Sequence, residues 1–225
     1  MEPINHTDKT KMNNSEAVAK LLLKLKAVTL NPNKPFRYAS GILSPVYTDC
    51  RVLIGYPDER TQIRDLYIEA IKQSGIEFDI VAGTATAGIP HAAWIADKLN
   101  LPMIYVRGKA KDHGKENLVE GPIKEGQKVI VIEDLVSTGE SSINSVNAIR
   151  NLGGEVSHVF SIITYGIGKG SEAFKENDLE LVSLTNFEEV VKEAQAQGYL
   201  NEEESEIVLD WISDPKDWAK RRGLE

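Results

Sequence analysis

The stretch KVIVIEDLVSTGESS, which runs from Lys128 to Ser142, predicts the fold of the whole chain. Its apolar part, Val129 to Ile132, is a continuous β-branched run, which is typical of a strand buried on both faces of a parallel sheet. The acidic pair Glu133–Asp134 comes next, and a hydroxyl-rich turn then leads into apolar residues with helical spacing. The order strand, acidic pair, turn and helix predicts a ligand site at the end of a strand.

The turn from Ser137 to Ser141 opens the predicted helix. The first turn of a helix presents unpaired N–H groups and the positive end of the dipole, both of which suit a phosphate. The acidic pair would repel a phosphate, but it can accept hydrogen bonds from sugar hydroxyls or hold the waters of a magnesium ion. A ribose 5-phosphate would satisfy both halves, whereas the plainer interpretation is that a hydroxyl residue only caps the helix.

The composition is that of an ordinary globular protein: of 225 residues, 41% are hydrophobic and 27% are charged. The net charge of −8 argues against general nucleic-acid binding and makes any local basic cluster informative. No apolar window is long enough to span a membrane, and the polar segment from Met1 to Asn14 is not a secretory signal. The single cysteine, Cys50, fits a reducing compartment. We therefore expect a cytoplasmic protein with no membrane or nucleic-acid partner.

Alternating helical and strand patterns predict an α/β fold with a mainly parallel central sheet flanked by helices. Residues 1–14 are expected to be disordered, and Ser15 is expected to cap the first amphipathic helix. The remaining elements are expected as helices over 57–76, from Gly88, over 187–196 and around 207–212, and as strands over 79–82, 103–106, 159–165 and 179–184. One domain is predicted over 15–213, with a small N-terminal part at about 15–51 and a polar tail over 214–225.

Two further segments carry chemistry. The loop GTATAG, from Gly83 to Gly88, lies between a predicted strand and helix, and its small residues let a ligand approach the backbone N–H groups. A tight packing turn is the alternative. The segment RGKAKDHGK, from Arg107 to Lys115, is basic at four of its nine residues. In an acidic protein such a loop, with glycine hinges, is suited to cover a polyanion, although a solvated charged loop is the commoner meaning.

Three motifs, in order, resemble those of the orotate phosphoribosyltransferases, over about residues 15–212. The segment from Pro35 to Arg51 resembles their N-terminal hood, the basic segment their mobile catalytic loop, and EDLVSTGES the signature of all type I phosphoribosyltransferases. The resemblance implies the type I phosphoribosyltransferase fold, including the hood. It also implies transfer of ribose 5-phosphate from phosphoribosyl pyrophosphate to orotate in pyrimidine (UMP) biosynthesis, with Mg²⁺ and a homodimer that shares its active sites.

The resemblance also implies roles for matched residues. The acidic pair contacts the ribose hydroxyls, Asp134 holds magnesium through water, and the basic loop reaches the pyrophosphate of the neighbouring subunit. The residues implied in binding phosphoribosyl pyrophosphate are Thr84, Ala85, Thr86, Arg107, Lys109, Lys111, His113, Glu133, Asp134, Leu135, Val136, Ser137, Thr138, Gly139, Glu140 and Ser141. Those implied as catalytic are Arg107, Lys111, His113 and Asp134, and those implied in binding orotate are Phe36, Ser40, Gly41 and Ser137.

Several positions depart from the family pattern. Ala39 and Thr86 stand where relatives carry lysines, and Glu140 stands where many have a glycine, so its carboxylate is expected to point away from the phosphate. No arginine follows the strand over 159–165, which leaves the orotate-carboxylate contact unassigned, with Lys169 as a candidate. Two other functions stay open: a phosphoribosyltransferase for another base, and a non-catalytic regulator that senses phosphoribosyl pyrophosphate.

Overall fold

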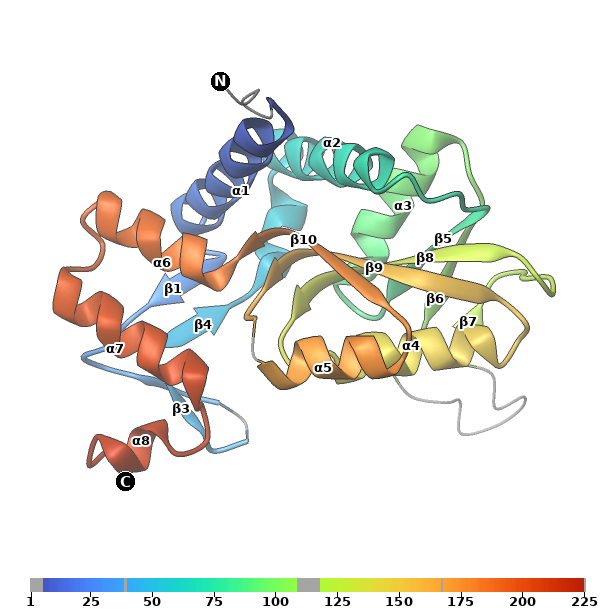
Figure 1. Ribbon diagram of the computed structural model, residues 1–225. Helices are drawn as coiled ribbons and strands as arrows, with labels where there is room; N and C mark the ends of the chain where they lie inside the picture. The colour runs from blue at the N-terminus through green and yellow to red at the C-terminus, as the bar shows by residue number, and fades with distance from the viewer. Residues whose placement is uncertain (1–5, 39, 109–117, 167, 225) are drawn as a thin grey trace, which may run out of the picture. The chain divides into compact units, whose positions relative to one another are not determined.

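The computed structural model describes residues 6–38, 40–108, 118–166 and 168–224 (Figure 1). The chain forms two compact units. We call the unit made of Pro57–Thr164 and Gly168–Leu184 the sheet unit, and the unit made of Met1–Tyr56, Tyr165–Ile167 and Thr185–Glu225 the terminal unit, because it contains both ends of the chain. The single domain that the sequence predicted over 15–213, with its N-terminal part at about 15–51, stays a prediction.

A six-stranded sheet with the strand order β10-β9-β8-β5-β6-β7 forms the centre of the sheet unit. The strands are β5 (Ile80–Thr84), β6 (Met103–Val106), β7 (Val119–Glu120), β8 (Lys128–Val136), β9 (Glu155–Thr164) and β10 (Glu180–Asn186). Strand β5 pairs in parallel with β6 and β8, and β8 pairs in parallel with β9, whereas β7 is antiparallel to β6. The predicted α/β fold with a mainly parallel sheet is confirmed.

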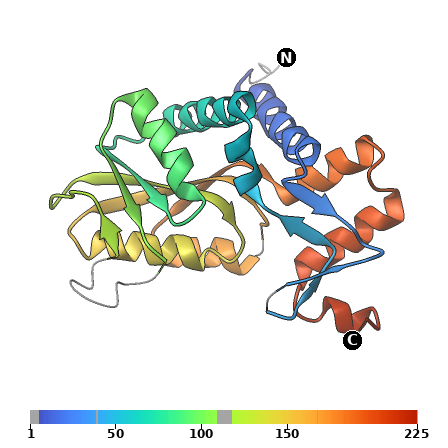
Figure 2. The same ribbon diagram turned by 180° about the vertical axis from the view of Figure 1, so that it is seen from behind.

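Helices cover both faces of this sheet. Their bounds are α2 (Pro57–Ser74), α3 (Gly88–Leu99), α4 (Glu140–Arg150) and α5 (Gly168–Glu176). Helices α2 and α3 lie on one face and α4 and α5 on the other, as the opposite view in Figure 2 also shows. The apolar stripe of α4, Val146 and Ile149, packs into a buried cluster with Val131 and Val159 of the sheet. This packing holds the start of α4 near the carboxyl ends of the strands.

Strand β8 is longer than the sequence predicted and contains the acidic pair. The predicted strand ended at Ile132, but β9 continues the ladder, pairing its Ser161 with Glu133 and its Ile163 with Leu135. Because successive side chains of a strand point to opposite faces, Glu133 is buried while Asp134 is partly exposed. The acidic pair is therefore fixed by the sheet and does not belong to a loop that follows it.

The terminal unit combines the N-terminal segment with the last three helices. Its elements are α1 (His6–Lys24), β1 (Val28–Leu30), β2 (Phe36–Arg37), β3 (Leu43–Ser44), β4 (Val46–Thr48), the 3-10 helix η1 (Cys50–Gly55), α6 (Phe187–Ala196), α7 (Glu202–Ser213) and α8 (Trp218–Arg221). Strands β2 and β3 form the antiparallel hairpin that the hood motif predicted, and β4 pairs with β1. Helix α1 packs against α6, and α6 against α7.

Helix α1 begins at His6, and residues 1–5 lie outside the description. The disorder predicted for residues 1–14 stays a prediction. The segment over 6–14 contains no glycine or proline, so nothing local stops the helix once its packed part has formed. Ser15 therefore caps nothing; its hydroxyl bonds that of Thr185 at 3.0 Å.

The C-terminal segment, predicted as a polar tail over 214–225, contains the short helix α8 and packs into the terminal unit through one aromatic residue. Trp218 is 0% exposed, and its indole N–H donates to the carbonyl of Ile207 at 3.2 Å. One large aromatic side chain supplies enough buried surface to anchor a short helix in an otherwise charged segment. Within the described part of the chain, no helix is both long enough and apolar enough to cross a membrane.

Candidate active site

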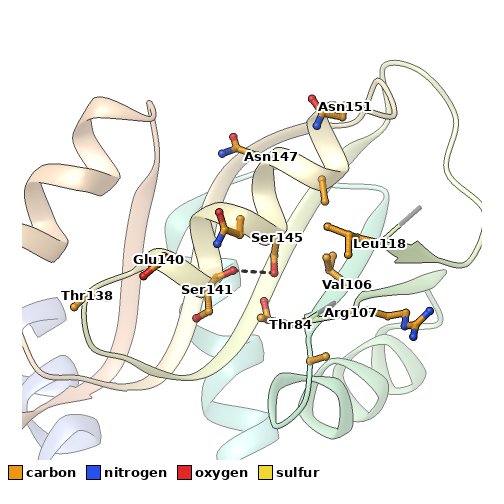
Figure 3. Close-up of a pocket in the computed structure, with 14 residues that line it drawn as sticks. Thr84, Val106, Arg107, Leu118, Thr138, Glu140, Ser141, Ser145, Asn147 and Asn151 are labelled. Carbon is orange, nitrogen blue, oxygen red and sulfur yellow. Dashed lines mark hydrogen bonds between the residues drawn. The ribbon is translucent and has the colours of Figure 1, made fainter. Parts of the chain in front are cut away.

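A cavity of about 670 Å³ lies in the sheet unit, between helix α4 and the ends of β5 and β6 (Figure 3). In Figure 3, Ser141 and Ser145 of α4 lie on one wall, and Thr84, Val106 and Arg107 lie on the other. The sequence-predicted residues that line it are Thr84, Ala85, Arg107, Thr138, Glu140 and Ser141. Three segments that are far apart in the sequence thus form one cavity, because the parallel strands before them end at the same edge of the sheet.

The turn before α4 has a conformation that requires glycine. Gly139 is the N-cap and has φ of +83°, so no side chain of the cap residue bonds the first turn. A Cβ atom on Gly139 would also lie 2.6 Å from Cε2 of Phe174. The plainer interpretation, that a hydroxyl residue caps α4, is therefore wrong, and the backbone N–H groups of its first turn can meet an anion.

A buried hydroxyl without a partner lies on the opposite wall. Thr84 is 4% exposed, and its Oγ1 atom has no hydrogen-bond partner among the described residues. Such groups are rare in folded proteins, and in a cavity they indicate a ligand or water that completes the bond. Thr84 is one of the residues predicted to contact the pyrophosphate, and its free hydroxyl is consistent with that role.

The Glu133 carboxylate faces helix α4. Its Oε2 atom accepts hydrogen bonds from the hydroxyls of Ser141, at 3.2 Å, and Ser142, at 3.4 Å, and its Oε1 atom accepts one from the backbone N–H of Asp134, at 3.2 Å. Burial, together with the negative charge of Asp134, raises the pKa of Glu133 well above its usual range. Asp134 is the more exposed member of the pair, and it is the better placed to meet a ligand.

Of the predicted loop from Arg107 to Lys115, the structure describes Arg107 and Gly108, and both line the cavity. The backbone N–H of Arg107 donates to the carbonyl of Leu118 at 2.9 Å, and its guanidinium lies 3.6 Å from a carboxylate oxygen of Glu120. The other predicted loop residues, Lys109, Lys111 and His113, lie outside the described residues. Their roles stay predictions.

The remaining predicted residues lie in two places. Leu135 and Val136 are the last residues of β8, and Val136 is 2% exposed, so its side chain is packed in the core. The predicted orotate residues Phe36, Ser40 and Gly41 lie in the hairpin segment of the terminal unit. The ring of Phe36 packs there against that of Tyr47, with 5.7 Å between the ring centroids. Thr86 and Ser137 follow β5 and β8 and are partly or fully exposed.

The structure adds residues that sequence reasoning missed. Asn144, Ser145 and Asn147 of α4 line the same cavity. The signal was available, because residues three and four places apart share one face of a helix, and Ser141 was already predicted to bind the substrate. Glu140 itself is exposed and lies on the cavity wall, and the direction of its carboxylate stays a prediction.

Comparison with known proteins agrees with the family resemblance of the sequence motifs. Residues 57–197 match the family model "Phosphoribosyl transferase domain". The chain is 50% identical over 209 residues to the orotate phosphoribosyltransferase of Listeria monocytogenes serotype 4b (strain F2365), covering 93% of this chain and 100% of the relative. It is 47% identical over 207 residues to that of Coxiella burnetii (strain RSA 493 / Nine Mile phase I), covering 92% and 99%.

A solved structure agrees with these relatives. The crystal structure of orotate phosphoribosyltransferase from Aeropyrum pernix superposes with a TM-score of 0.71 at 32% identity, covering 82% of this chain and 99% of that one. The residues matched by the family model, 57–197, include the loop from Gly83 to Gly88, Arg107 and the turn from Ser137 to Ser141. The chain therefore belongs to the phosphoribosyltransferase family and, within it, to the orotate phosphoribosyltransferases.

Proposed function

We propose that this protein transfers the 5-phosphoribosyl group of phosphoribosyl pyrophosphate to N1 of orotate, giving orotidine 5-monophosphate and pyrophosphate. The observation that carries the proposal is the shared cavity. The first turn of α4 lies on one wall, and the Thr84 hydroxyl, which has no hydrogen-bond partner within the described part of the chain, lies on the other. A substrate with a phosphate at each end of a ribose matches such a cavity. The near 50% identity to named orotate phosphoribosyltransferases supports orotate as the acceptor.

Each part of the substrate has a proposed place. The 5-phosphate binds the backbone N–H groups of the turn from Thr138 to Ser141, at the start of α4. Asp134, with Glu133 beside it, accepts hydrogen bonds from the ribose hydroxyls. The pyrophosphate lies between the loop from Thr84 to Thr86 and the cation of Arg107. Orotate is proposed to stack near Phe36, with Ser137 and the Ser40–Gly41 turn as further contacts.

Magnesium fits this site as an ion that arrives with the substrate. Among the described residues, no three acidic, histidine or cysteine side chains gather closely enough to hold a metal. Magnesium in phosphate-handling enzymes commonly keeps several waters and is held by one or two carboxylates together with substrate phosphates. The partly exposed Asp134 supplies a carboxylate of that kind. When bound, the ion neutralises the developing charge of the pyrophosphate.

The chemical step follows from the distribution of charge. Breaking the bond to the anomeric carbon leaves a cationic sugar and an anionic pyrophosphate. Asp134 stabilises the cation, while Arg107, with Lys111 and His113, stabilises the leaving anion. Orotate is already an anion when it binds, so the reaction needs no strong protein base. Because the basic loop is proposed to reach a neighbouring subunit, the active protein is proposed to be a homodimer.

The cellular setting is also a proposal. The one cysteine, Cys50, is a buried free thiol, which fits a reducing cytoplasm. The net charge of −8 argues against nucleic acid as a partner.

The test is orotate consumption by the purified protein with phosphoribosyl pyrophosphate and magnesium. Parallel reactions contain adenine, hypoxanthine or uracil. We expect loss of the orotate absorbance that depends on both the co-substrate and the metal. Turnover of another base without turnover of orotate would overturn the assignment of the hairpin segment but keep the phosphate site. Binding of phosphoribosyl pyrophosphate with no turnover of any base would favour a regulator, which a mobility-shift assay with nucleic acid would then examine.

A further inference from the structure

Strand β8 loses one of its two neighbours where the acidic pair begins. Its pairing with β5 ends at the partners Gly83 and Ile132, while its pairing with β9 continues to Val136. From Glu133 onward, the side of β8 that faced β5 therefore needs other partners for its backbone groups, because buried backbone carbonyls are nearly always hydrogen-bonded.

The side chain of Tyr67, on helix α2, supplies one such partner. Its hydroxyl donates to the backbone carbonyl of Glu133 at 2.6 Å, across 66 residues of sequence. Tyr67 is 0% exposed, and its ring packs against the ring of His91 on α3, with 6.0 Å between the ring centroids. The start of α3 packs closely against the neighbouring backbone of β8. A Cβ atom on Gly88 would lie only 2.3 Å from the carbonyl oxygen of Ile132.

A second buried group holds the Glu133 side chain. Ser142 is 0% exposed, and its hydroxyl donates to Oε2 of Glu133 alongside that of Ser141. Ser142 belongs to the first turn of α4, whose backbone is proposed to bind the 5-phosphate. This bond therefore links the acidic pair to the phosphate turn, so the ribose and phosphate positions are held in one piece.

We propose that Tyr67 and Ser142 are positioning residues for the acidic pair. Tyr67 fixes the backbone at Glu133, and Ser142 fixes its side chain, so that the pair presents Asp134 to the ribose hydroxyls of phosphoribosyl pyrophosphate. The inference rests on the proposed function. Neither residue is among the site residues that the sequence predicted, and neither lines the cavity.

The first variant is Tyr67→Phe, which keeps the packed ring and removes only the donor. Loss of one buried hydrogen bond corresponds to about tenfold in an equilibrium constant. We therefore expect kcat/KM for phosphoribosyl pyrophosphate to fall about tenfold, mainly through a higher KM, with the KM for orotate unchanged. Tyr165→Phe is the matched control: this tyrosine is 6% exposed, and its hydroxyl donates to Thr48 at 2.9 Å within the terminal unit. It should leave the KM for phosphoribosyl pyrophosphate unchanged.

The second variant, Ser142→Ala, tests the inference independently should Tyr67→Phe not fold. It should raise the same KM, whereas Ser205→Ala, which removes a buried hydroxyl bonded to the carbonyl of Asn201, should not. In an Asp134→Ala background, the weakening of phosphoribosyl pyrophosphate binding by Tyr67→Phe and by Ser142→Ala, measured as a Kd, should shrink, because both residues act by positioning the Asp134 carboxylate.

The outcomes separate this inference from the proposed function. If wild-type protein converts orotate but Tyr67→Phe and Ser142→Ala keep its KM for phosphoribosyl pyrophosphate within twofold, the inference is overturned and the function stands. Equal changes in both KM values, with undiminished effects on the Kd for phosphoribosyl pyrophosphate in the Asp134→Ala background, would likewise show a purely structural role. If wild-type protein turns over no orotate, the function fails. Calorimetric titration with magnesium and phosphoribosyl pyrophosphate then tests the inference by itself, with a weaker Kd expected in both variants.

Discussion

Gly139 and Phe174 pack so closely that no side chain fits at position 139. A Cβ atom there would lie 2.6 Å from Cε2 of Phe174, which is 2% exposed on α5. Gly139 also has φ of +83°, a conformation that other residues adopt only with strain. The turn that leads into α4 is thus shaped from two directions, by its own backbone and by the aromatic ring behind it.

Gly139→Ala is expected to disrupt the phosphate turn. The left-handed conformation costs about 1 kcal/mol, and the contact with Phe174 adds an overpacking cost of about 1–3 kcal/mol. Denaturant unfolding and the KM for phosphoribosyl pyrophosphate measure the two consequences, and we expect a KM at least about tenfold higher. Gly126→Ala is the control, because Gly126 has φ of +79° but nothing within 4 Å of a Cβ atom. Equal effects of the two variants would show that the contact with Phe174 does not matter.

Glu140→Gly tests the position that departs from the family pattern. If its carboxylate points away from the phosphate, the KM for phosphoribosyl pyrophosphate should stay within about twofold of wild type. Stability should fall by about 1 kcal/mol, because glycine replaces an acid in the first turn of a helix. Glu202→Gly, in the first turn of α7, is the matched control for stability. Much tighter substrate binding in Glu140→Gly would show that the carboxylate faces the phosphate.

Lys111→Ala tests the basic loop. Removing one preorganised cation from a developing anion should lower kcat by roughly a hundredfold. Steady-state kinetics measure this, and Lys124→Ala, at an exposed lysine of the sheet unit, should behave as wild type. A Lys111→Ala variant with wild-type kcat and KM would remove the loop from the mechanism.

Mixing two inactive variants tests the shared active site of the proposed homodimer. If Lys111 serves the neighbouring subunit, subunits carrying Lys111→Ala and subunits carrying Asp134→Asn should regain part of the activity when they are mixed and allowed to exchange. Each mixed dimer then contains one site with both residues intact. Mixtures that stay as inactive as their components, with exchange verified by mass, would place Lys111 in its own subunit's site.

His91 makes stability depend on pH. It is 1% exposed, both ring nitrogens lack hydrogen-bond partners among the described residues, and burial lowers its pKa from 6.5 to about 4. The unfolded chain therefore binds a proton that the folded chain does not, between about pH 6.5 and pH 4. The contribution is fully present above pH 6.5, and up to ~3 kcal/mol of stability is lost as the pH falls towards 4.

The check is urea unfolding at several pH values for wild type and His91→Leu. As the pH falls from 6.5 to 4, the unfolding free energy of the wild type should fall steadily relative to that of His91→Leu. A difference that is constant over this range would show that His91 keeps an ordinary pKa in the folded protein.

Trp211 is expected to hold the hairpin of β2 and β3. Its indole N–H donates to the carbonyl of Leu43 at 3.2 Å. Its ring packs edge-on against the rings of Tyr38 and Tyr165, with centroid distances of 6.4 Å and 5.8 Å. Trp211→Phe should cost about 1–3 kcal/mol and raise the KM for orotate severalfold while leaving that for phosphoribosyl pyrophosphate unchanged. Trp218→Phe removes the corresponding bond to Ile207 and is the control. If it raises the KM for orotate equally, the bond to Leu43 has no special role.

Local patterns in the sequence were enough to predict the strand, turn and helix units around the site. The apolar run from Val129 to Ile132, the glycine at 139 and the helical spacing after it predicted strand, turn and helix, and the GTATAG loop repeated that order. These features depend on periodicity and on the conformations that single residues allow, which act over a few neighbours. Their fit to a known family added the reaction.

Contacts between distant segments could not be predicted in this way, because they depend on the folded chain as a whole. The extension of β8 through Glu133 depends on pairing with β9. The hydrogen bond from the Tyr67 hydroxyl to the backbone carbonyl of Glu133 joins residues that are 66 positions apart. The burial of Trp218, in a segment whose composition looks like a solvated tail, depends on packing within the terminal unit. Such contacts depend on how all the elements of the fold pack together. No local pattern predicts them, because neither partner stands out from the residues around it in the sequence.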